Sequence, residues 1–331
     1  MNFYHLSELP EIKVQKLVTR AAALSHGQPA ANLQSSALEL FFLAPSLRTS
    51  ASFQRAASKL QMQLLQLSGS SVWGLETGEG VVMDGEAAEH VKEAAAVLGT
   101  YVDALAVRAF PTRRSLAEDL EDPVMKAFLD HAGVPVINME SARWHPCQAL
   151  ADRLTLEQHG VPQRGRLVLS WAWHPKPLPH AVPNSTLTMA AQRGMDVVLL
   201  HPPGFHLHPS VIEQAEFLAD LNGGVLTVTH DRESALTGAD VVYAKSWGSL
   251  DHWTDSNAEA DLREPLRHWC VTPDWLRGGA KFMHCLPVRR NVVVSDEVMD
   301  SPSSIVVQQA ANRLPAQTAI LESLLCPVLQ A

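Results

Sequence analysis

Residues 38–49 read LELFFLAPSLRT, an apolar run followed at once by Ser46, Arg48 and Thr49. The run has the length and composition of a buried strand, and the segment after it, from residue 51 onward, has the character of a helix. Polar donors at the start of a helix stand where free backbone N–H groups and the helix dipole favour an anion. An ordinary serine or threonine N-cap explains the same residues. The stretch predicts a strand–turn–helix unit, with either a simple cap or an anion site at the turn.

Strand-like and helical segments alternate along the rest of the chain. Further strands are predicted at 63–68, 102–108, 134–140, 165–173, 195–202, 224–230, 240–247, 281–287 and 304–309. Helices are predicted at 6–24, 86–101, 122–133, 146–158 and 185–193, and the proline-rich stretch 174–184 is predicted to be a rigid surface loop. This alternation predicts an α/β fold with mainly parallel sheets flanked by helices. Functional residues are then expected at the carboxyl ends of the strands.

The chain has 331 residues, which is long for a single core, so two domains are expected. The helix at 146–158 is predicted to join them. We expect a first domain over residues 1–145, a second over 146–309, and a C-terminal helix over about 310–331 that packs back onto the first domain.

Composition excludes several classes of protein. The net charge of −9 and the lack of basic runs argue against a nucleic-acid binder. The four cysteines are widely spaced and form no CxxC pair, which is typical of a reducing compartment. The N-terminal residues lack the apolar stretch of a signal peptide, and no apolar run approaches the length of a membrane span. We therefore expect a soluble, cytoplasmic protein without a nucleic-acid or membrane partner.

Polar clusters follow several of the predicted strands. Arg108 closes one strand, HPCQ (145–148) opens the joining helix, and KSWG (245–248) and HCLPVRRN (284–291) follow two others. Taken singly, each has a structural explanation: a surface ion pair for the arginine, a helix cap for His145, or a buried core position for Cys285. Their shared position after strands favours a functional site.

Three of these motifs, SLRT, HPCQ and HCLP, resemble those of the aspartate/ornithine transcarbamylase family, in the same order. The resemblance extends from FFLAPSLRT to AANR. The segments WGLETGEGVVMDGEAAEH, VRAF, HPKPL and HCLPVRRNV are similar to the branch of the family that acts on N-acylated ornithine. The resemblance implies two α/β domains, the first holding carbamoyl phosphate and the second the amino substrate. It also implies a homotrimer with active sites between subunits, and a knot in the second domain that involves the proline-rich loop.

The resemblance further implies a set of residues that bind carbamoyl phosphate. Thr49, Arg108 and His145 would stabilise the developing oxyanion, and Cys285 would orient the substrate because the substrate amine is itself the nucleophile. Arg108, His145, Gln148 and Cys285 form the implied catalytic set. Trp73 would reach the phosphate from a neighbouring subunit. No metal or organic cofactor is required. The implied carbamoyl phosphate-binding residues are Ser46, Leu47 (through its backbone N–H), Arg48, Thr49, Trp73, Arg108, His145, Gln148, Cys285, Leu286 and Arg313.

Several positions bear on the acyl group of the second substrate. Ala88 occupies a position where the acetyl-specific branch carries glutamate, and Glu140 lies five residues before His145, as in the succinyl branch. Val293 replaces a lysine found in some acetyl-branch members, so no modified lysine is expected there. These features predict N-succinylornithine as the substrate. The residues implied to bind it are Ala88, Glu140, His174, Lys245, Leu286 and Arg289.

Other functions compete with this interpretation. N-acetylornithine is the closest alternative substrate. Free ornithine is disfavoured because Lys245 stands where an acid would be needed for an α-ammonium group. A dehydrogenase lacks support because the G-x-G-x-x-G turn is missing. A non-catalytic relative that binds carbamoyl phosphate or forms a trimeric scaffold is favoured only by Ser50, which replaces an arginine common in the family.

Overall fold

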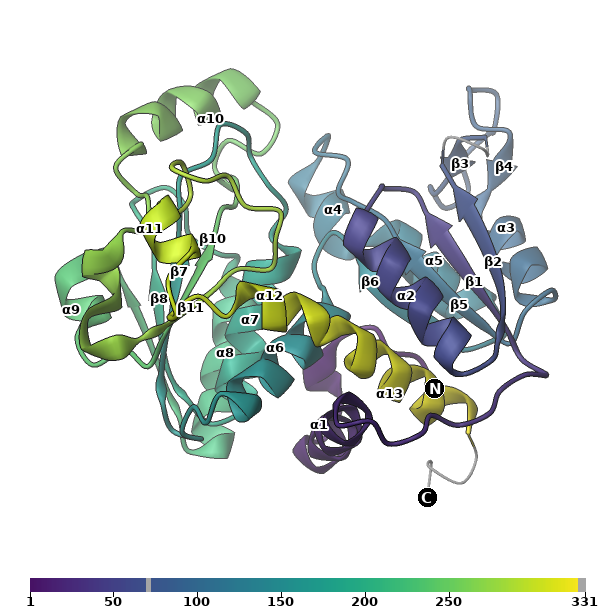
Figure 1. Ribbon diagram of the computed structural model, residues 1–331. Helices are drawn as coiled ribbons and strands as arrows, with labels where there is room; N and C mark the ends of the chain where they lie inside the picture. The colour runs from purple at the N-terminus through teal and green to yellow at the C-terminus, as the bar shows by residue number, and fades with distance from the viewer. Residues whose placement is uncertain (70–72, 327–331) are drawn as a thin grey trace. The chain divides into compact units, whose positions relative to one another are not determined.

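The computed structural model describes residues 1–69 and 73–326. The chain divides into two compact units (Figure 1). The first contains Met1–Thr112, Ala117–Leu150 and the segment from Arg313 onward, and the second contains Arg113–Leu116 and Ala151–Asn312. Each unit is built around its own parallel sheet flanked by helices, which confirms the predicted α/β class.

The sheet of the first unit has the strand order β2-β1-β5-β6. Its strands are β1 (Ala37–Phe42), β2 (Gln63–Ser68), β5 (Ala104–Arg108) and β6 (Val136–Glu140). The chain runs from β1 outward to β2, then returns to β5 on the other side of β1. This reversal makes a topological switch point, where ligands bind at the carboxyl ends of parallel strands. Phe42 and Arg108 are register partners at that end.

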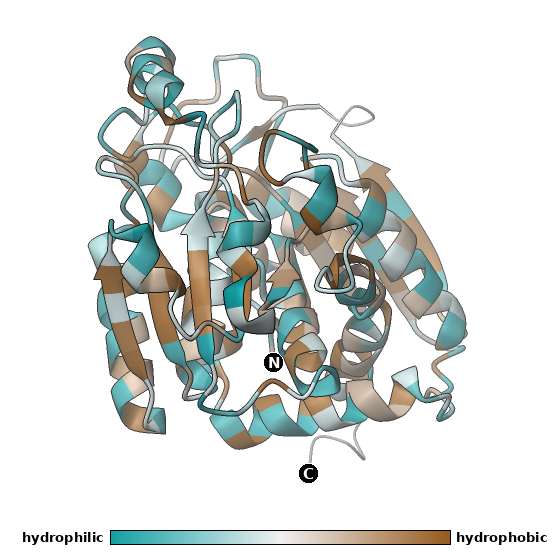
Figure 2. Ribbon diagram, turned by 60° about the vertical axis from the view of Figure 1, so that its left-hand side comes forward, coloured by the Kyte–Doolittle hydropathy of each residue, from teal (hydrophilic) through white to brown (hydrophobic). Residues whose placement is uncertain are grey.

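Helices cover both faces of this sheet. On one face, α3 (Val91–Gly99) and α5 (Pro123–His131) pack apolar side chains on Phe41, Leu105 and Val107. On the other, α2 (Leu47–Lys59) contacts α13 (Arg313–Leu325), which in turn contacts α1 (Glu11–Ser25) (Figure 1). The strands are largely hydrophobic, whereas the helices are banded because only one stripe of each faces a core (Figure 2).

The sheet of the second unit has the order β11-β10-β7-β8-β9. Its strands are β7 (Arg166–Trp171), β8 (Asp196–Leu200), β9 (Val225–Thr229), β10 (Val241–Lys245) and β11 (Lys281–Met283). The helices α7 (Ala181–Gln192) and α8 (Pro209–Asn222) connect β7 to β8 and β8 to β9, and α9 (Arg232–Leu236) precedes the return to β10. The strand order therefore reverses between β7 and β10, where Trp171 and Lys245 are register partners. Like the first unit, this one has a switch point at the carboxyl ends of its strands.

Smaller elements complete the two units. They are η1 (Leu6–Glu8), β3 (Leu75–Glu76), β4 (Glu89–His90), α4 (Leu116–Glu121), α6 (Pro146–Gln158), α10 (Ser256–Arg263), η2 (Glu264–Leu266), η3 (Pro273–Gly279), α11 (Asp296–Met299) and α12 (Val306–Ala311). Within the described ranges, no helix has the combination of length and apolar character needed to cross a bilayer. The last residues of the predicted C-terminal helix, 327–331, lie outside the described part of the chain. The knot stays a prediction.

The strand predicted at 304–309 is wrong, because residues 306–311 form α12. Val306 and Gln309 are both buried, three residues apart, which is a helical spacing. The Gln309 amide donates to Asp152 Oδ1 at 2.7 Å, and its oxygen accepts from the His284 backbone N–H at 2.9 Å. These tertiary hydrogen bonds outweigh the strand propensity of the two valines.

Three predicted helices have different starts in the structure. The helix expected from residue 86 begins at Val91, because Glu89–His90 pairs with Leu75–Glu76 and the His90 ring accepts from the Lys92 backbone N–H at 3.2 Å. The helix expected from 185 begins at Ala181, inside the proline-rich stretch. At the N-terminus, α1 begins after Pro10, and residues 6–8 form the separate turn η1. In the first and third cases a strand pair, cap or turn interrupts the apolar periodicity, whereas α7 extends further toward the N-terminus than predicted.

Candidate active site

The SLRT turn joins β1 to α2 and is organised by Ser46. The Ser46 hydroxyl accepts from the Thr49 backbone N–H at 3.4 Å and donates to the Thr49 hydroxyl at 2.9 Å. The N-cap interpretation is therefore confirmed, and the helix begins at Leu47 rather than at residue 51. The Leu47 side chain is 82% exposed, while Arg48 is partly buried in the same first turn. Backbone N–H groups in this turn have no carbonyl partner within the helix, so the cap leaves donors suited to an anion.

Arg313, at the start of α13, reaches this turn from the far end of the chain. Its Nη2 donates to the Thr49 hydroxyl oxygen at 2.8 Å across a sequence separation of 264 residues. Both side chains are buried. The fold thus brings the AANR and SLRT motifs into contact and places a guanidinium beside the capped helix start.

Arg108, Glu140 and His145 form a second buried cluster at the ends of β5 and β6. The strands are out of step between Val107 and Arg108, which makes Arg108 and Glu140 register partners. Arg108 Nη1 donates to Glu140 Oε2, and His145 Nε2 lies 3.6 Å from the same oxygen. The carboxylate therefore sits between a guanidinium and an imidazole. This negative charge orients both groups and offsets the cost of burying the arginine.

The helix α6 presents the HPCQ motif to this cluster. His145 precedes the first residue of α6, and its backbone carbonyl accepts from the N–H groups of Gln148 and Ala149, both at 3.1 Å. Gln148 is 1% exposed. Burial raises the pKa of the Cys147 thiol to about 12, so this cysteine is a neutral packing residue rather than a nucleophile.

Ser50 occupies the position where the family commonly has arginine. Its hydroxyl donates to Gln66 Oε1 at 3.1 Å and accepts from Gln54 Nε2 at 2.9 Å. A neutral network between α2 and β2 therefore takes the place of that cation.

Trp73 and Ala88 are brought close to one another by the small parallel sheet β3–β4. Trp73 Nε1 donates to Glu89 Oε2 at 2.8 Å, next in sequence to Ala88. The Trp73 side chain is 61% exposed, and Ala88 is exposed as well. These two predicted site residues share one surface of the first unit.

The second unit carries a cationic cluster at its own switch point. Lys245 ends β10 and is buried, while His174 follows β7 and Arg289 follows β11. Arg289 Nε donates to His174 Nε2 at 3.1 Å, which leaves Nδ1 to donate to the Lys176 carbonyl at 2.8 Å. Burial lowers the pKa of His174, and neighbouring Arg289 and Lys245 lower it further. The ring is therefore neutral at pH 7 and the cluster favours an anionic ligand.

The HCLP segment follows β11. The Leu286 backbone N–H donates to His284 Nδ1 at 2.9 Å, and Cys285 is 8% exposed. Leu286 has φ of 58°, in the left-handed region that a leucine rarely adopts. Such backbone geometry gathers at functional sites.

Sequence reasoning missed Arg263. This arginine ends α10, is 3% exposed and forms an ion pair with buried Glu259 one turn earlier. Arg263 also influences His174 electrostatically. The Glu-x-x-x-Arg spacing of a helical ion pair was the available signal.

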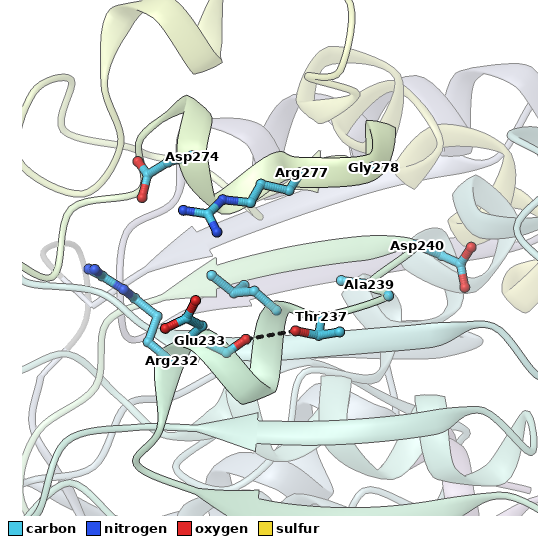
Figure 3. A pocket seen from close by; sticks show the side chains of 10 residues that line it. Arg232, Glu233, Thr237, Ala239, Asp240, Asp274, Arg277 and Gly278 are labelled. Atoms are coloured by element: carbon cyan, nitrogen blue, oxygen red, sulfur yellow. Dashed lines mark hydrogen bonds between the residues drawn. The ribbon is translucent and has the colours of Figure 1, made fainter.

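A pocket of about 470 Å³ lies elsewhere in the second unit, between α9 and η3 (Figure 3). Arg232 and Glu233 line it from α9, and Asp274 and Arg277 line it from η3. None of the predicted site residues lines this pocket. In the described ranges, no group of three or more His, Cys, Asp or Glu side chains could hold a metal ion.

Comparison with known proteins assigns both halves of the chain. Residues 1–158 match the carbamoyl-P binding domain of aspartate/ornithine carbamoyltransferase, and residues 179–324 match its Asp/Orn binding domain. The N-acetylornithine carbamoyltransferase of Xanthomonas campestris is 42% identical over 98% of this chain and 97% of its own length. The N-succinylornithine carbamoyltransferase of Bacteroides fragilis is 38% identical over 87% of each.

Solved structures agree over the whole fold. A crystal structure of acetylornithine transcarbamylase complexed with acetylcitrulline superposes with a TM-score of 0.95 at 41% identity, covering 98% of this chain and 99% of that one. A glutamate-to-alanine variant of N-acetyl-L-ornithine transcarbamylase, complexed with carbamyl phosphate and N-succinyl-L-norvaline, has the same TM-score at 42% identity, covering 98% and 100%. The chain belongs to the aspartate/ornithine carbamoyltransferase family and is a carbamoyltransferase.

Proposed function

We propose that the protein transfers the carbamoyl group of carbamoyl phosphate to the δ-amine of N-succinyl-L-ornithine. The products are N-succinyl-L-citrulline and phosphate, and the reaction belongs to arginine biosynthesis. The observation that carries the choice of acyl group is Ala88, a small uncharged residue beside the Trp73–Glu89 hydrogen bond. The two units divide the work: the first binds carbamoyl phosphate and the second binds the acylornithine.

The SLRT turn is proposed to hold the phosphate. The Ser46 and Thr49 hydroxyls, the Leu47 N–H and the Arg48 guanidinium supply hydrogen-bond donors at a positive helix end. Arg313 supports Thr49 through their 2.8 Å hydrogen bond and contacts carbamoyl phosphate itself. Trp73 completes the site from a neighbouring subunit.

Arg108 and His145 are proposed to polarise the carbamoyl carbonyl, together with Thr49. As the uncharged δ-amine attacks the carbonyl carbon, a C–N bond forms and negative charge gathers on the carbonyl oxygen. Fixed donors stabilise that charge more than they stabilise the ground state. The intermediate then expels phosphate as the C–O bond to the phosphate group breaks, and the proton lost by the attacking amine leaves with the phosphate. Gln148 and the backbone carbonyls of Cys285 and Leu286 accept hydrogen bonds from the carbamoyl amine and fix its orientation.

Glu140 is expected from the sequence to contact the ornithine portion of the substrate, and this stays a proposal. Its carboxylate is already bonded to Arg108 and faces His145. We propose that Glu140 orients these two groups and also accepts from the attacking amine. A carboxylate acceptor near the amine favours a correctly oriented nucleophile.

Ala88 is proposed to make room for the succinyl group. A glutamate there would fill the space and repel the terminal carboxylate of a succinyl chain. A glutamate-to-alanine variant of the acetyl enzyme was crystallised with N-succinyl-L-norvaline, as were variants with proline, valine or serine at that glutamate. We propose that Ala88 takes the place of the glutamate replaced in those variants. Removing its charge and bulk is the change that those four variants share.

His174, Lys245 and Arg289 are proposed to receive the carboxylates of the acylornithine. They converge at the switch point of the second unit, and Lys245 and Arg289 are cations. N-acetylornithine is the second candidate substrate, favoured by the 42% identity to the Xanthomonas enzyme.

We further propose a cytoplasmic homotrimer in which each active site borrows Trp73 from a neighbouring subunit. Mixing inactive Trp73→Ala and Arg108→Ala proteins should then restore part of the activity after subunit exchange, because some sites receive both intact residues. If exchange occurs without recovery, Trp73 acts within its own subunit.

A substrate panel tests the proposed function directly. Purified protein is assayed for citrulline-type products with carbamoyl phosphate and ornithine, N-acetylornithine or N-succinylornithine. We expect the highest kcat/KM with N-succinylornithine. A much faster reaction with N-acetylornithine would reject the succinyl assignment, and carbamoyl phosphate binding without turnover of any amine would support a non-catalytic relative.

A further inference from the structure

We propose that Arg113 is a specificity-determining residue that binds the second carboxylate of a dicarboxylic acyl group, such as the terminal carboxylate of succinyl. This inference rests on the proposed function and adds a residue that no sequence motif identified.

The guanidinium of Arg113 is held in place by two neighbours in the second unit. Its Nη2 donates to the Trp253 carbonyl at 3.0 Å, and its Cζ lies 4.5 Å from the centre of the Trp253 ring. Its Nη1 packs on Gly248: a Cβ added to that glycine would lie 2.9 Å from Nη1. Arg113 itself has φ of 59°. Stacking on an indole holds an arginine in a fixed orientation, and a guanidinium presents a rigid fork of donors that matches a carboxylate.

This position is where two proposed substrate-binding segments meet. Gly248 follows Lys245 by three residues, a span of at most about 10 Å in extended chain. Pro177, three residues after His174, would lie 3.0 Å from that same added Cβ on Gly248. The Gly248 N–H also donates to the Leu178 carbonyl at 3.0 Å, which ties the two segments together. Arg113 therefore lies at the junction of KSWG and HPKPL.

The electrostatic surroundings favour a ligand with more than one negative charge. Arg289, Lys245 and Arg263 all act on His174 as cations. Burial lowers the pKa of Arg263 to about 10, and Arg113 acts on it in the same direction, which places the two guanidiniums near each other. Glu259 neutralises Arg263 and also accepts from the Ser249 N–H at 3.3 Å. Arg289 and Lys245 are therefore the cations that act most strongly on His174, and Arg113 adds a further positive charge near Arg263.

Two buried hydroxyls in the same segment add a second, independent observation. Ser246 is 2% exposed and Ser249 is fully buried, and neither Oγ has a hydrogen-bond partner among the described residues. A buried hydroxyl without a partner is costly. Both serines lie within two residues of Gly248, which contacts Arg113. The KSWGS segment thus carries spare hydrogen-bonding capacity next to Arg113.

The number of carboxylates on the substrate indicates which group Arg113 would bind. N-acetylornithine carries one carboxylate, whereas N-succinylornithine carries two, separated by the acyl chain. If Arg113 receives the terminal carboxylate, Lys245 and Arg289 are left for the α-carboxylate. Arg113 packs a few residues further along the same segments. A Cβ at Gly248 would lie 2.9 Å from Nη1, so the guanidinium would have to shift from its present position.

The test compares Arg113→Gln with Arg113→Lys and with the matched control Arg114→Gln on the same loop. Values of kcat/KM are measured for N-succinylornithine and N-acetylornithine. Calorimetry with carbamoyl phosphate present measures binding of N-succinyl-L-norvaline and N-acetyl-L-norvaline, which cannot react. We expect Arg113→Gln to weaken the succinyl reaction and binding about 10-fold or more, mainly through KM, because a charge-assisted hydrogen bond is lost. Both acetyl measurements should stay within about 2-fold, and lysine should restore part of the loss.

Gly248→Ala provides a second route, since displacing Arg113 should cause the same selective loss. Equal losses for both acyl groups would show that Arg113 only holds the loop, and no loss would show that it does not meet the substrate; either result overturns the inference. If no acylornithine is turned over, the proposed function fails, and the norvaline binding arm alone decides the role of Arg113. Undiminished binding of N-succinyl-L-norvaline by Arg113→Gln, or no binding by the wild type, overturns it there.

Discussion

Arg108 and Glu140 form a buried ion pair at the ends of two neighbouring strands, and the same carboxylate oxygen lies 3.6 Å from His145. Removing one partner of a buried pair leaves an uncompensated charge, which is more costly than the pair itself is favourable. Two of the groups proposed to polarise carbamoyl phosphate therefore depend on one carboxylate for their position.

Glu140→Gln should destabilise the ligand-free protein by about 3 kcal/mol, because the Arg108 charge loses its partner. Bound carbamoyl phosphate supplies negative charge, so it should raise the unfolding temperature of the variant more than that of the wild type. Thermal unfolding with and without carbamoyl phosphate measures both effects. Glu264→Gln, in an exposed pair with Arg267, is the control and should change little. Identical ligand-induced shifts in the variant and the wild type would show that the dianion does not compensate Arg108.

His145→Ala should lower kcat by about 100-fold while carbamoyl phosphate still binds, because its contribution is to the developing oxyanion. Single-turnover kinetics and calorimetric titration with carbamoyl phosphate separate the chemical step from binding. His159→Ala, an exposed histidine just beyond the other end of α6, is the matched control. If binding is lost while the chemical step is unimpaired, His145 binds carbamoyl phosphate in the ground state instead of stabilising the oxyanion.

Ala88→Glu should lower kcat/KM for N-succinylornithine and shift preference toward N-acetylornithine. The added carboxylate repels the succinyl carboxylate and takes up space beside Trp73. Competition between the two substrates in one reaction gives the preference directly. Ala87→Glu adds the same charge one residue away and should have a smaller effect. If both variants retain the wild-type preference, Ala88 does not meet the acyl group.

Glu39→Leu should stabilise the protein increasingly as pH rises. Glu39 is 1% exposed in β1, neither carboxyl oxygen has a hydrogen-bond partner among the described residues, and burial raises its pKa to about 7. Folding raises the pKa of this carboxyl group, so between the unfolded and folded pKa values the folded protein keeps a proton that the unfolded chain has lost. The resulting destabilisation of the folded state is absent below about pH 4.5 and grows as pH approaches 7. Urea unfolding should show a gain on the order of 2 kcal/mol larger at pH 8 than at pH 4.5.

The exposed Glu213→Gln is the control for that pH series. A Glu39→Leu gain that is the same at both pH values would mean that added apolar burial, rather than the carboxyl group, accounts for the stabilisation.

Local pattern was sufficient for most of the architecture. The apolar runs at 38–44, 134–140 and 165–173 each contain a buried strand, and the helix predicted at 146–158 has those bounds in α6. Burial periodicity and N-cap chemistry act over a few residues, so they are visible in the sequence. The positions of Arg108, Lys245 and the SLRT turn after strands also follow from local order, since the carboxyl ends of parallel strands share one edge of a sheet.

The contacts that make the site were decided by tertiary structure. No local pattern could pair Arg313 with Thr49, turn Glu140 toward Arg108, or place Arg113 on Gly248. Tertiary contacts also explain why the strand prediction for residues 304–309 is wrong. Their valines by themselves favour a strand, but Gln309 hydrogen-bonds Asp152 and His284 from within a helix. Backbone periodicity records which face of an element is buried. The partner of a buried polar side chain can lie anywhere along the chain, and an unpaired buried group costs more than the local preference of one or two residues can offset.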